Sequence, residues 1–483
     1  MGWTLGELGL TGPDVTVTGL SVSDRDARPG HLFAALPGTN AHGARFAGAA
    51  VANGAVAVLT DPAGTDIAAV DVPVIAVEDP RAALAFAAAL MAGDQPDTMV
   101  AVTGTNGKTS VAAFTRQIWE ALGHRAVNLG TTGVEGGYHA PSVHTTPEPI
   151  TLHRLLADMA RAGVTHAAME ASSHGLDQRR LEAVRLAAAA FTNLTQDHLD
   201  YHGDMDAYLA AKAGLFERIL PADAVAVIDL DDPAGPALAT GCNARGQEVI
   251  GYGRAPESRL QLTGQRFDAT GQDVVFRWQG RAHAARLDLI GGFQATNVLC
   301  AAGLAIAAGE DPVQVFAVLP KLTGVRGRMQ LAATRGNGAT VFVDYAHTPD
   351  AVATALRALR PHVMGRIVAV VGAGGDRDTG KRPLMGAAAA EHADVVIVTD
   401  DNPRSEDPAA IRAAVRGGAP GAVECGDRAE AILRGAGLLE PGDALLVMGK
   451  GHESGQIVGD MVLPFDDVEQ ASIAVAALDG RVA

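Results

Sequence analysis

The chain has 483 residues, of which 48% are hydrophobic, only 4% are aromatic and 57 are glycine, and its formal net charge is −17. At roughly 150 residues per domain, this length predicts about three domains, and the abundance of small residues favours α/β architecture. The negative charge argues against binding of nucleic acid or of an anionic membrane, because both require clustered Lys and Arg. The three widely spaced cysteines argue against a disulfide framework or a zinc site and indicate a reducing cytoplasm.

The first 95 residues form a predicted domain of their own. The N-terminal segment lacks the basic and apolar regions of a signal peptide, and no run approaches 18 apolar residues, so we expect an unprocessed, soluble protein. Short apolar runs alternate with turns up to an alanine-rich helix over residues 81–91. The stretch 93–97, Gly-Asp-Gln-Pro-Asp, predicts a linker, and we place the first boundary there, between residues 95 and 96.

A strand over 99–102, a glycine-rich loop and a helix with apolar residues at helical spacing follow the linker. The loop is similar to a Walker A motif, but Val102 stands where that motif has its first glycine. Backbone amides and the helix N-terminus can cradle phosphates, Lys108 can neutralise them and Thr109 can bind Mg²⁺. The predicted ATP-binding residues here are Gly104, Thr105, Asn106, Gly107, Lys108, Thr109 and Ser110.

A phosphate loop alone fits a kinase, a GTPase or a ligase, so the residues downstream must discriminate. Further strands are predicted to end at Met169, Leu194 and Ile228, which indicates a largely parallel sheet in a central domain over 96–325. Glu170 and His198 follow two of these strands and could hold a metal beside the loop, although each alone is more often structural.

Two other features of this region have a simpler interpretation. His198 and His202 are four residues apart, but without an H-E-x-x-H pattern they do not favour a zinc pair. Lys212 lies on a predicted alanine-rich helix, and on pattern alone it is a solvated surface lysine.

The C-terminal region, residues 326–483, predicts a third α/β domain. Residues 322–328 should be an exposed crossing into it, and four short apolar strands follow at 339–343, 367–371, 395–398 and 444–447. Each ends in a polar or glycine-rich loop, where open α/β sheets bind ligands. The run 372–375, Gly-Ala-Gly-Gly, lacks the full dinucleotide fingerprint.

These motifs together resemble the Mur ligase family, which builds the peptide stem of bacterial cell-wall precursors, and the similarity covers nearly the whole chain. The matching segments are the short phosphate loop, Glu170–Gly175, Phe191–Tyr201, Lys212, Gly327–Met329, Asp344–Asp350, Gly374–Asp378, Asp401–Arg404 and Gly449–Glu453. The resemblance implies three α/β domains: an N-terminal UDP-binding domain, a central P-loop ATPase domain and a C-terminal Rossmann-like domain that binds an amino acid.

The resemblance also implies the reaction. ATP phosphorylates a carboxylate of UDP-N-acetylmuramoyl-L-alanyl-D-glutamate, and the amine of meso-diaminopimelate attacks the acyl phosphate, releasing ADP and phosphate. The implied catalytic residues are Lys108, Glu170, His198 and Lys212. Lys212 would be carbamylated and would hold Mg²⁺ together with Thr109, Glu170 and His198. The implied enzyme is cytoplasmic, monomeric and bound to small molecules only, without nucleic acid or membrane insertion.

The remaining substrate positions also come from the family. Asn297, Arg328 and Asp344 match its adenine and ribose positions, although Gln294 departs from the family's F-N-x-x-N motif. Ser23, in a Ser-Asp-Arg run where the family has Asp-Ser-Arg, is the implied uridine contact. The implied contacts of the sugar-dipeptide are Thr145, Thr146, Ser172, Gln178 and Arg180.

Selection of diaminopimelate over lysine requires a cation for the extra carboxylate. Arg404, which follows Asp401-Asn402-Pro403, can form a bidentate fork with it, whereas the competing interpretation treats the segment as an ordinary turn. The implied amino-acid contacts are Arg377, Asp401, Asn402, Pro403, Arg404, Gly449 and Glu453. The rival hypotheses are a folylpolyglutamate synthetase, which shares the short loop, and a non-catalytic nucleotide-binding regulator.

Overall fold

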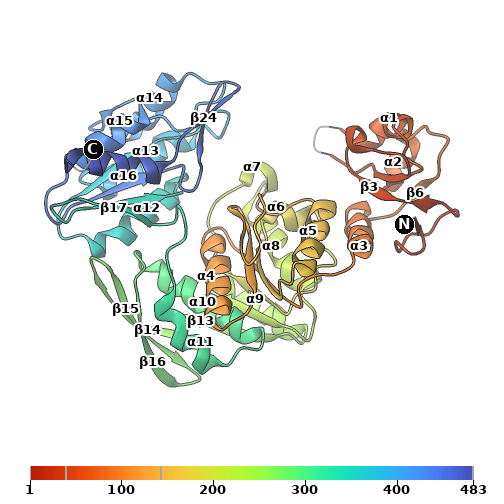
Figure 1. Cartoon of the computed structure of the whole chain (residues 1–483), viewed down its shortest axis with the longest axis horizontal. Helices are drawn as coiled ribbons and strands as arrows, with labels where there is room; N and C mark the ends of the chain where they lie inside the picture. The colour runs from red at the N-terminus through yellow and green to blue at the C-terminus, as the bar shows by residue number, and fades with distance from the viewer. Residues whose placement is uncertain (1, 39–40, 142–143, 481–483) are drawn as a thin grey trace. The chain divides into compact units, whose positions relative to one another are not determined.

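A computed structural model gives the fold of the chain and describes residues 2–38, 41–141 and 144–480 (Figure 1). The chain packs into two compact units, and each is described by itself. The first comprises Met1–Leu194, His198–Gly251 and Cys300–Asp311, and the second comprises Thr195–Asp197, Tyr252–Leu299 and Pro312–Ala483. Within the described residues, no helix is both long and apolar enough to cross a membrane.

The first unit begins with a short antiparallel pair, β1 (Trp3–Thr4) and β2 (Thr16–Val17), and continues with a four-stranded parallel sheet in the order β3-β4-β5-β6. Its strands are β3 (Gly19–Ser21), β4 (His31–Ala34), β5 (Ala57–Thr60) and β6 (Val74–Ala76). Alternate side chains of these strands pack on α1 (Ala47–Ala52) and on α3 (Pro80–Ala92), so the sheet has a core on each face. A short helix, α2 (Pro62–Ile67), is capped by Asp61.

The central sheet of the first unit is parallel except for its edge strand β9 and runs in the order β12-β11-β7-β10-β8-β9. Its strands are β7 (Thr98–Thr103), β8 (Ala126–Gly130), β9 (Gly133–Gly136), β10 (His166–Glu170), β11 (Ala188–Phe191) and β12 (Val225–Asp229). The interior positions of these strands are mostly apolar and buried because helices cover the sheet.

Helices connect the strands of this sheet. The helices are α4 (Lys108–Ala121), α5 (Pro149–Arg161), α6 (Ser173–Asp177), α7 (Leu199–His202), α8 (Met205–Gly214) and α9 (Gly235–Ala244). In α4 the predicted apolar face is confirmed, since Val111, Phe114 and Ile118 are fully buried. In α5, Leu152, Leu156 and Met159 face the sheet.

The second unit contains an antiparallel meander that the sequence did not predict. Its strands are β14 (Leu260–Asp268), β15 (Gly271–Trp278) and β16 (Arg281–Leu287), and β13 (Glu248–Gly253), most of which belongs to the first unit, precedes them. The turn at 279–280 is Gln-Gly, and the turn at 269–270 is Ala-Thr with Gly271 directly after it, so a glycine lies at each hairpin. The helices α10 (Phe293–Ala307) and α11 (Pro312–Val318) follow.

The six-stranded sheet of the second unit has the order β17-β18-β22-β19-β20-β21 and is parallel except for β17. Its strands are β17 (Gln330–Thr334), β18 (Thr340–Asp344), β19 (Ile367–Val371), β20 (Val395–Val398), β21 (Val423–Glu424) and β22 (Ala444–Met448). One face packs on α12 (Pro349–Leu359), α13 (Lys381–His392) and α14 (Pro408–Gly418), and the other on α15 (Arg428–Gly437) and α16 (Asp467–Leu478) (Figure 1). A hairpin, β23 (Gly455–Val458) and β24 (Met461–Pro464), completes the unit.

The α/β class is confirmed, and most predicted elements lie within two residues of the observed ones. β11 ends at Phe191 and not at Leu194, because the chain turns there to support the phosphate loop. The crossing at 322–328 is only partly exposed, since Leu322 and Val325 are buried.

Candidate active site

The glycine-rich loop lies at the carboxyl end of β7, as predicted, and leads into α4. Gly104 has φ 148° and Gly107 has φ 88°, conformations that favour glycine. A Cβ on Gly104 would overlap Thr192 Oγ1, so glycine lets the loop approach the segment that follows β11. All the predicted loop residues lie in this turn or in the first turn of α4.

Side chains fix the shape of the loop. Asn106 N donates to Asn193 Oδ1 at 2.9 Å, and Thr192 Oγ1 donates to Asn106 O at 2.6 Å. Lys108 Nζ lies over the loop, where it donates to Gly104 O at 2.8 Å and to Thr105 O at 2.9 Å. The ammonium group is thus held where a bound phosphate needs a cation.

Glu170 is buried at the end of β10, with 2% of its surface exposed. Thr109 Oγ1 donates to Glu170 Oε2 at 3.1 Å, Thr131 N donates to Oε1 at 2.8 Å, and Thr131 Oγ1 donates to Oε2 at 3.2 Å. A Cβ on Gly130 would overlap this carboxylate, so glycine is required there too. The Thr109 hydroxyl and the Glu170 carboxylate are oxygen ligands of the kind that Mg²⁺ prefers, and they fit that ion.

The predicted dipeptide residues join the same network. Thr145 Oγ1 lies 3.0 Å from Thr131 Oγ1, and Thr146 Oγ1 donates to Glu170 O at 3.0 Å. Ser172 Oγ donates to Thr146 Oγ1 at 3.0 Å. The residues predicted to bind phosphate, metal and dipeptide are therefore connected by hydrogen bonds.

Gln178 and Arg180 extend this network into a pocket. Arg180 donates to Thr146 O at 2.7 Å and to Gln178 Oε1 at 2.7 Å. The pocket is lined by Val22, Leu36, Arg81, Leu84, Glu148, Pro149, Gln178 and Arg180. Burial, with the charge of Arg81 adding to it, lowers the pKa of Arg180, so two guanidinium groups share a recess that suits an anion.

Lys212 is not the solvated lysine that its pattern alone indicates. It is 1% exposed, and its Nζ lies 4.1 Å from the centre of the Tyr208 ring. Tyr208 OH is 3.3 Å from Thr105 Oγ1, which links this helix to the phosphate loop. The ring of His198 packs edge-on against His174, with 4.8 Å between centroids.

Ser23 has a structural role in the described chain. Its hydroxyl caps the short helix Asp24–Asp26 by accepting from Arg25 N at 3.3 Å. Its assignment to uridine binding stays a prediction.

In the second unit, the predicted nucleotide residues lie on α10 and around the end of β18. Asn297 Nδ2 donates to Gln294 Oε1 at 3.0 Å. Gln294, which replaces the first asparagine of the family motif, therefore orients Asn297, which matches the second. The guanidinium of Arg328 stacks over Tyr345 at 4.7 Å, and Asp344 accepts from Met329 N at 2.8 Å. Burial raises the pKa of Asp344, and the charge of Arg328 opposes this shift.

The predicted amino-acid residues gather at the carboxyl edge of the six-stranded sheet. Asn402 Nδ2 donates to Glu453 Oε2 at 2.8 Å, and the buried Lys450 Nζ donates to Asn402 Oδ1 at 2.9 Å and to Glu453 Oε2 at 3.2 Å. A Cβ on Gly449, which has φ 119°, would overlap the Asp401 carboxylate. These loops follow β20 and β22, two strands that both flank β19.

Arg404 is presented by an unusual backbone conformation. Its φ of 52° places it in the left-handed region, and its N donates to Ile457 O at 3.1 Å. One guanidinium nitrogen donates to Gly375 O at 2.8 Å, in the loop after β19 that also carries the exposed Arg377. The preceding Pro403 carbonyl lies so close to Gly375 that a Cβ there would overlap it.

Some residues of these networks were not predicted as site residues, among them Thr131, Tyr208 and Lys450. Thr131 bonds Glu170, Tyr208 covers Lys212, and Lys450 bonds Asn402. Lys450 belongs to the recognised Gly449–Glu453 run, so it could have been found, whereas isolated Thr131 and Tyr208 carry no signal in the sequence.

Comparison with known proteins shows which family and which proteins the chain is similar to. Family models described as "Mur ligase family, catalytic domain", "Mur ligase middle domain" and "Mur ligase, glutamate ligase domain" match residues 16–91, 102–305 and 327–451. The UDP-N-acetylmuramoyl-L-alanyl-D-glutamate--2,6-diaminopimelate ligase of Caulobacter vibrioides is 51% identical, with 96% of this chain and 97% of that protein covered. The ligase of the same name from Bradyrhizobium diazoefficiens is 52% identical, with 95% of each covered. A solved structure of a ligase of this name has a TM-score of 0.72, 34% identity and 99% coverage of both chains.

Proposed function

The chain belongs to the Mur ligase family, and we propose that it is an ATP-dependent ligase joining meso-diaminopimelate to UDP-N-acetylmuramoyl-L-alanyl-D-glutamate. It thus resembles UDP-N-acetylmuramoyl-tripeptide synthetases and acts in peptidoglycan precursor biosynthesis in the cytoplasm, as a monomer. ATP is its second substrate. We propose that residues 1–95 bind the UDP-sugar, residues 96–325 bind ATP and residues 326–483 bind the amino acid.

The observation that carries this proposal is the continuous network around Glu170. It joins Thr109, which follows the phosphate-binding lysine, to Thr146 and Arg180, which suit the carboxylate-bearing substrate. A kinase or GTPase brings a hydroxyl or a water to the γ-phosphate, whereas a ligase of this kind must bring a carboxylate there.

In the first step, an oxygen of the D-glutamyl carboxylate attacks the γ-phosphorus and ADP leaves. Both reactants are anionic, so the approach requires cations. Lys108 Nζ, now held by two loop carbonyls, is proposed to neutralise the phosphates, and the amides before α4 are proposed to cradle them. Asn297, Arg328 and Asp344 are the proposed contacts of the nucleotide.

Mg²⁺ fits the oxygen ligands of Thr109 and Glu170 at the carboxyl edge of the central sheet. These two residues and a ring nitrogen of His198 would hold it. When bound, it would supply charge neutralisation for the phosphoryl group. Carbamylation of Lys212 would replace a buried ammonium, which is costly to desolvate, by a carboxylate-like ligand.

In the second step, the amine of diaminopimelate attacks the acyl carbon, forms the amide bond and expels phosphate while giving up a proton. Arg404 is proposed to grip the distal carboxylate as a fork, beside Asn402. Arg377, Asp401, Gly449 and Glu453 are the proposed contacts of the other charged groups. Lysine lacks the distal carboxylate, so it would leave Arg404 unmatched.

The test measures phosphate release by the purified protein. We expect release only when ATP, UDP-N-acetylmuramoyl-L-alanyl-D-glutamate and meso-diaminopimelate are all present. The Lys108→Ala variant should turn over on the order of 1000-fold more slowly.

Other outcomes would favour other hypotheses. Equal turnover with lysine would refute the selectivity argument, and turnover with folate and glutamate would favour a folylpolyglutamate synthetase. ATP binding without any turnover would favour the non-catalytic regulator.

A further inference from the structure

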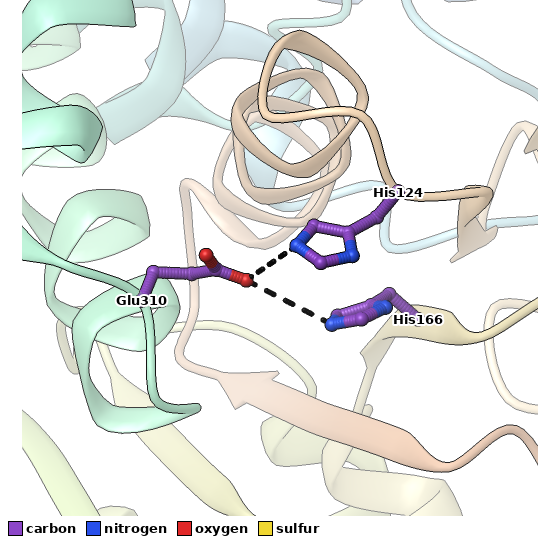
Figure 2. Close-up of side chains that lie close together, drawn as sticks. All are labelled: His124, His166 and Glu310. Atoms are coloured by element: carbon purple, nitrogen blue, oxygen red, sulfur yellow. Dashed lines mark ion pairs between the residues drawn. The ribbon is translucent and has the colours of Figure 1, made fainter.

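Two histidines and a glutamate that the ligase reaction does not use meet at the opposite edge of the central sheet. His124 lies in the turn after α4, His166 is the first residue of β10, and Glu310 follows α10. One ligand atom from each lies within 4.8 Å of the others, and Figure 2 shows both rings turning a nitrogen toward the same carboxylate oxygen. All three belong to the first unit.

The distances differ between the two histidines. His124 Nε2 is 2.8 Å from Glu310 Oε1, a hydrogen-bond distance, whereas His166 Nε2 is 3.8 Å from the same oxygen, which is too long for one. The ring centroids lie 4.0 Å apart with a 36° interplanar angle. The two nitrogens and the oxygen therefore surround a small common space.

Thr165 contacts the second ring nitrogen of His166. Thr165 Oγ1 lies 2.8 Å from His166 Nδ1 and 3.4 Å from Arg125 O, so its single hydrogen can be directed to either of them. When the hydroxyl donates to Arg125 O, Nδ1 of a neutral His166 carries the proton and Nε2 presents a lone pair toward the carboxylate.

In that tautomer, a cation between Nε2 and the carboxylate oxygen would relieve the repulsion between their lone pairs. Tetrahedral ligand atoms that bind Zn²⁺ at about 2.0–2.1 Å lie roughly 3.3 Å from one another. This separation falls between the two observed distances from a histidine Nε2 to Glu310 Oε1, which are 2.8 Å and 3.8 Å. The bond from Nδ1 to Thr165 is the kind of outer contact that orients a metal-binding histidine. His124 is 34% exposed, which leaves a route for the ion.

We propose that His124, His166 and Glu310 form a binding site for one zinc-like divalent cation, distinct from the Mg²⁺ of the phosphate loop. Two imidazoles and one carboxylate suit Zn²⁺ better than Mg²⁺ or Ca²⁺, which prefer oxygen ligands throughout. His166 begins β10 and Glu170 ends it, so the two edges are roughly 13 Å apart along the strand. The ion therefore links three chain segments and does not touch the phosphates.

The competing interpretation is a hydrogen-bonded pair of His124 and Glu310 with His166 stacked beside it. Zn²⁺ titration of chelator-treated protein by calorimetry, with Mg²⁺ in large excess, separates the two. We expect one Zn²⁺ to bind with micromolar or tighter affinity and to raise the melting temperature, and Co²⁺ to give the intense visible absorption of a tetrahedral site.

The matched variants are His166→Gln, Glu310→Gln and the control His139→Gln, which replaces an exposed histidine of the same unit. Both site variants should lose about 100-fold or more in Zn²⁺ affinity, together with the shift in melting temperature, and the control should lose neither. Glu310→Gln keeps a hydrogen-bond acceptor for His124, so it serves if His166→Gln fails to fold. Equal Zn²⁺ affinity in the site variants and the control, or no binding by the parent protein, would overturn the proposal.

Discussion

The two sheet edges that carry the proposed chemistry hold their acidic groups in opposite ways. At the central sheet, the groups that donate to Glu170 are the hydroxyls of Thr109 and Thr131 and one amide, all of them neutral. At the six-stranded sheet, Glu453 pairs with the ammonium of Lys450, and Asp467 pairs with the guanidinium of Arg428 in full burial.

Neutral donors orient a carboxylate without cancelling its charge, whereas a paired cation does both. The central edge therefore keeps negative charge that suits an added cation such as Mg²⁺. The other edge is balanced by the chain itself and suits a substrate that carries equal numbers of ammonium and carboxylate groups. Three experiments test this difference, from the largest expected effect to the smallest.

Glu170→Gln should give the largest effect. The single amide oxygen of glutamine can still accept from the Thr109 and Thr131 hydroxyls, but the side chain loses its charge and the acceptor for Thr131 N, so we expect kcat to fall by on the order of 10²- to 10³-fold and the Mg²⁺ requirement to rise. Steady-state phosphate release at increasing Mg²⁺ concentration measures both quantities.

The control for this experiment is Glu135→Gln on β9, at the edge of the same sheet. Its turnover should match that of the parent protein. If Glu170→Gln kept full turnover at ordinary Mg²⁺, the charge of this carboxylate would not be needed, and the contrast between the two edges would fail.

Arg404→Ala tests the balanced edge. Removing two charge-assisted hydrogen bonds should raise the KM for meso-diaminopimelate by about 30- to 100-fold, while the dissociation constant of ATP stays unchanged. Arg416→Ala is the matched control, because that guanidinium pairs with Glu424 on the surface of the same unit. Loss of ATP affinity in Arg404→Ala would show that the residue acts in nucleotide binding instead.

The sequence predicted the strands and the loops at their ends well, because short buried apolar runs followed by glycine or polar residues have few alternatives. Strands β19 and β20 have the predicted bounds, and α3 extends one residue beyond the predicted range 81–91 at each end. The meander β14–β16 was missed because its exposed strands are polar and alternate weakly.

The site was less predictable than the fold, since its supporting contacts join residues far apart in the chain. Lys212 has the sequence surroundings of a surface residue, and only packing against Tyr208 makes it buried. Likewise, nothing in the sequence near Thr131 indicates that it bonds a carboxylate 39 residues later. The roles of the individual site residues stay predictions until variants are measured.

Asp229 offers the smallest and most local test of excess negative charge at the central edge. It ends β12, and its side chain accepts from Asp231 N at 2.9 Å. Burial raises its pKa from 3.8 to about 7; the amide of Asp231 opposes this shift, while the charges of Asp231 and Asp232 add to it. Between these two pKa values the folded state binds more proton than the unfolded state, so this group makes stability fall as the pH rises.

Asp229→Asn should remove this dependence, because the amide oxygen of asparagine can accept the same hydrogen bond without a charge. The loss of unfolding free energy between about pH 5 and about pH 8 should therefore shrink by about 2 kcal/mol, measured by urea unfolding at each pH. Asp223→Asn, in the exposed turn before β12, should leave the pH profile unchanged. An identical profile for Asp229→Asn would mean that this carboxylate is already compensated, and the charge excess at the central edge would then be confined to Glu170.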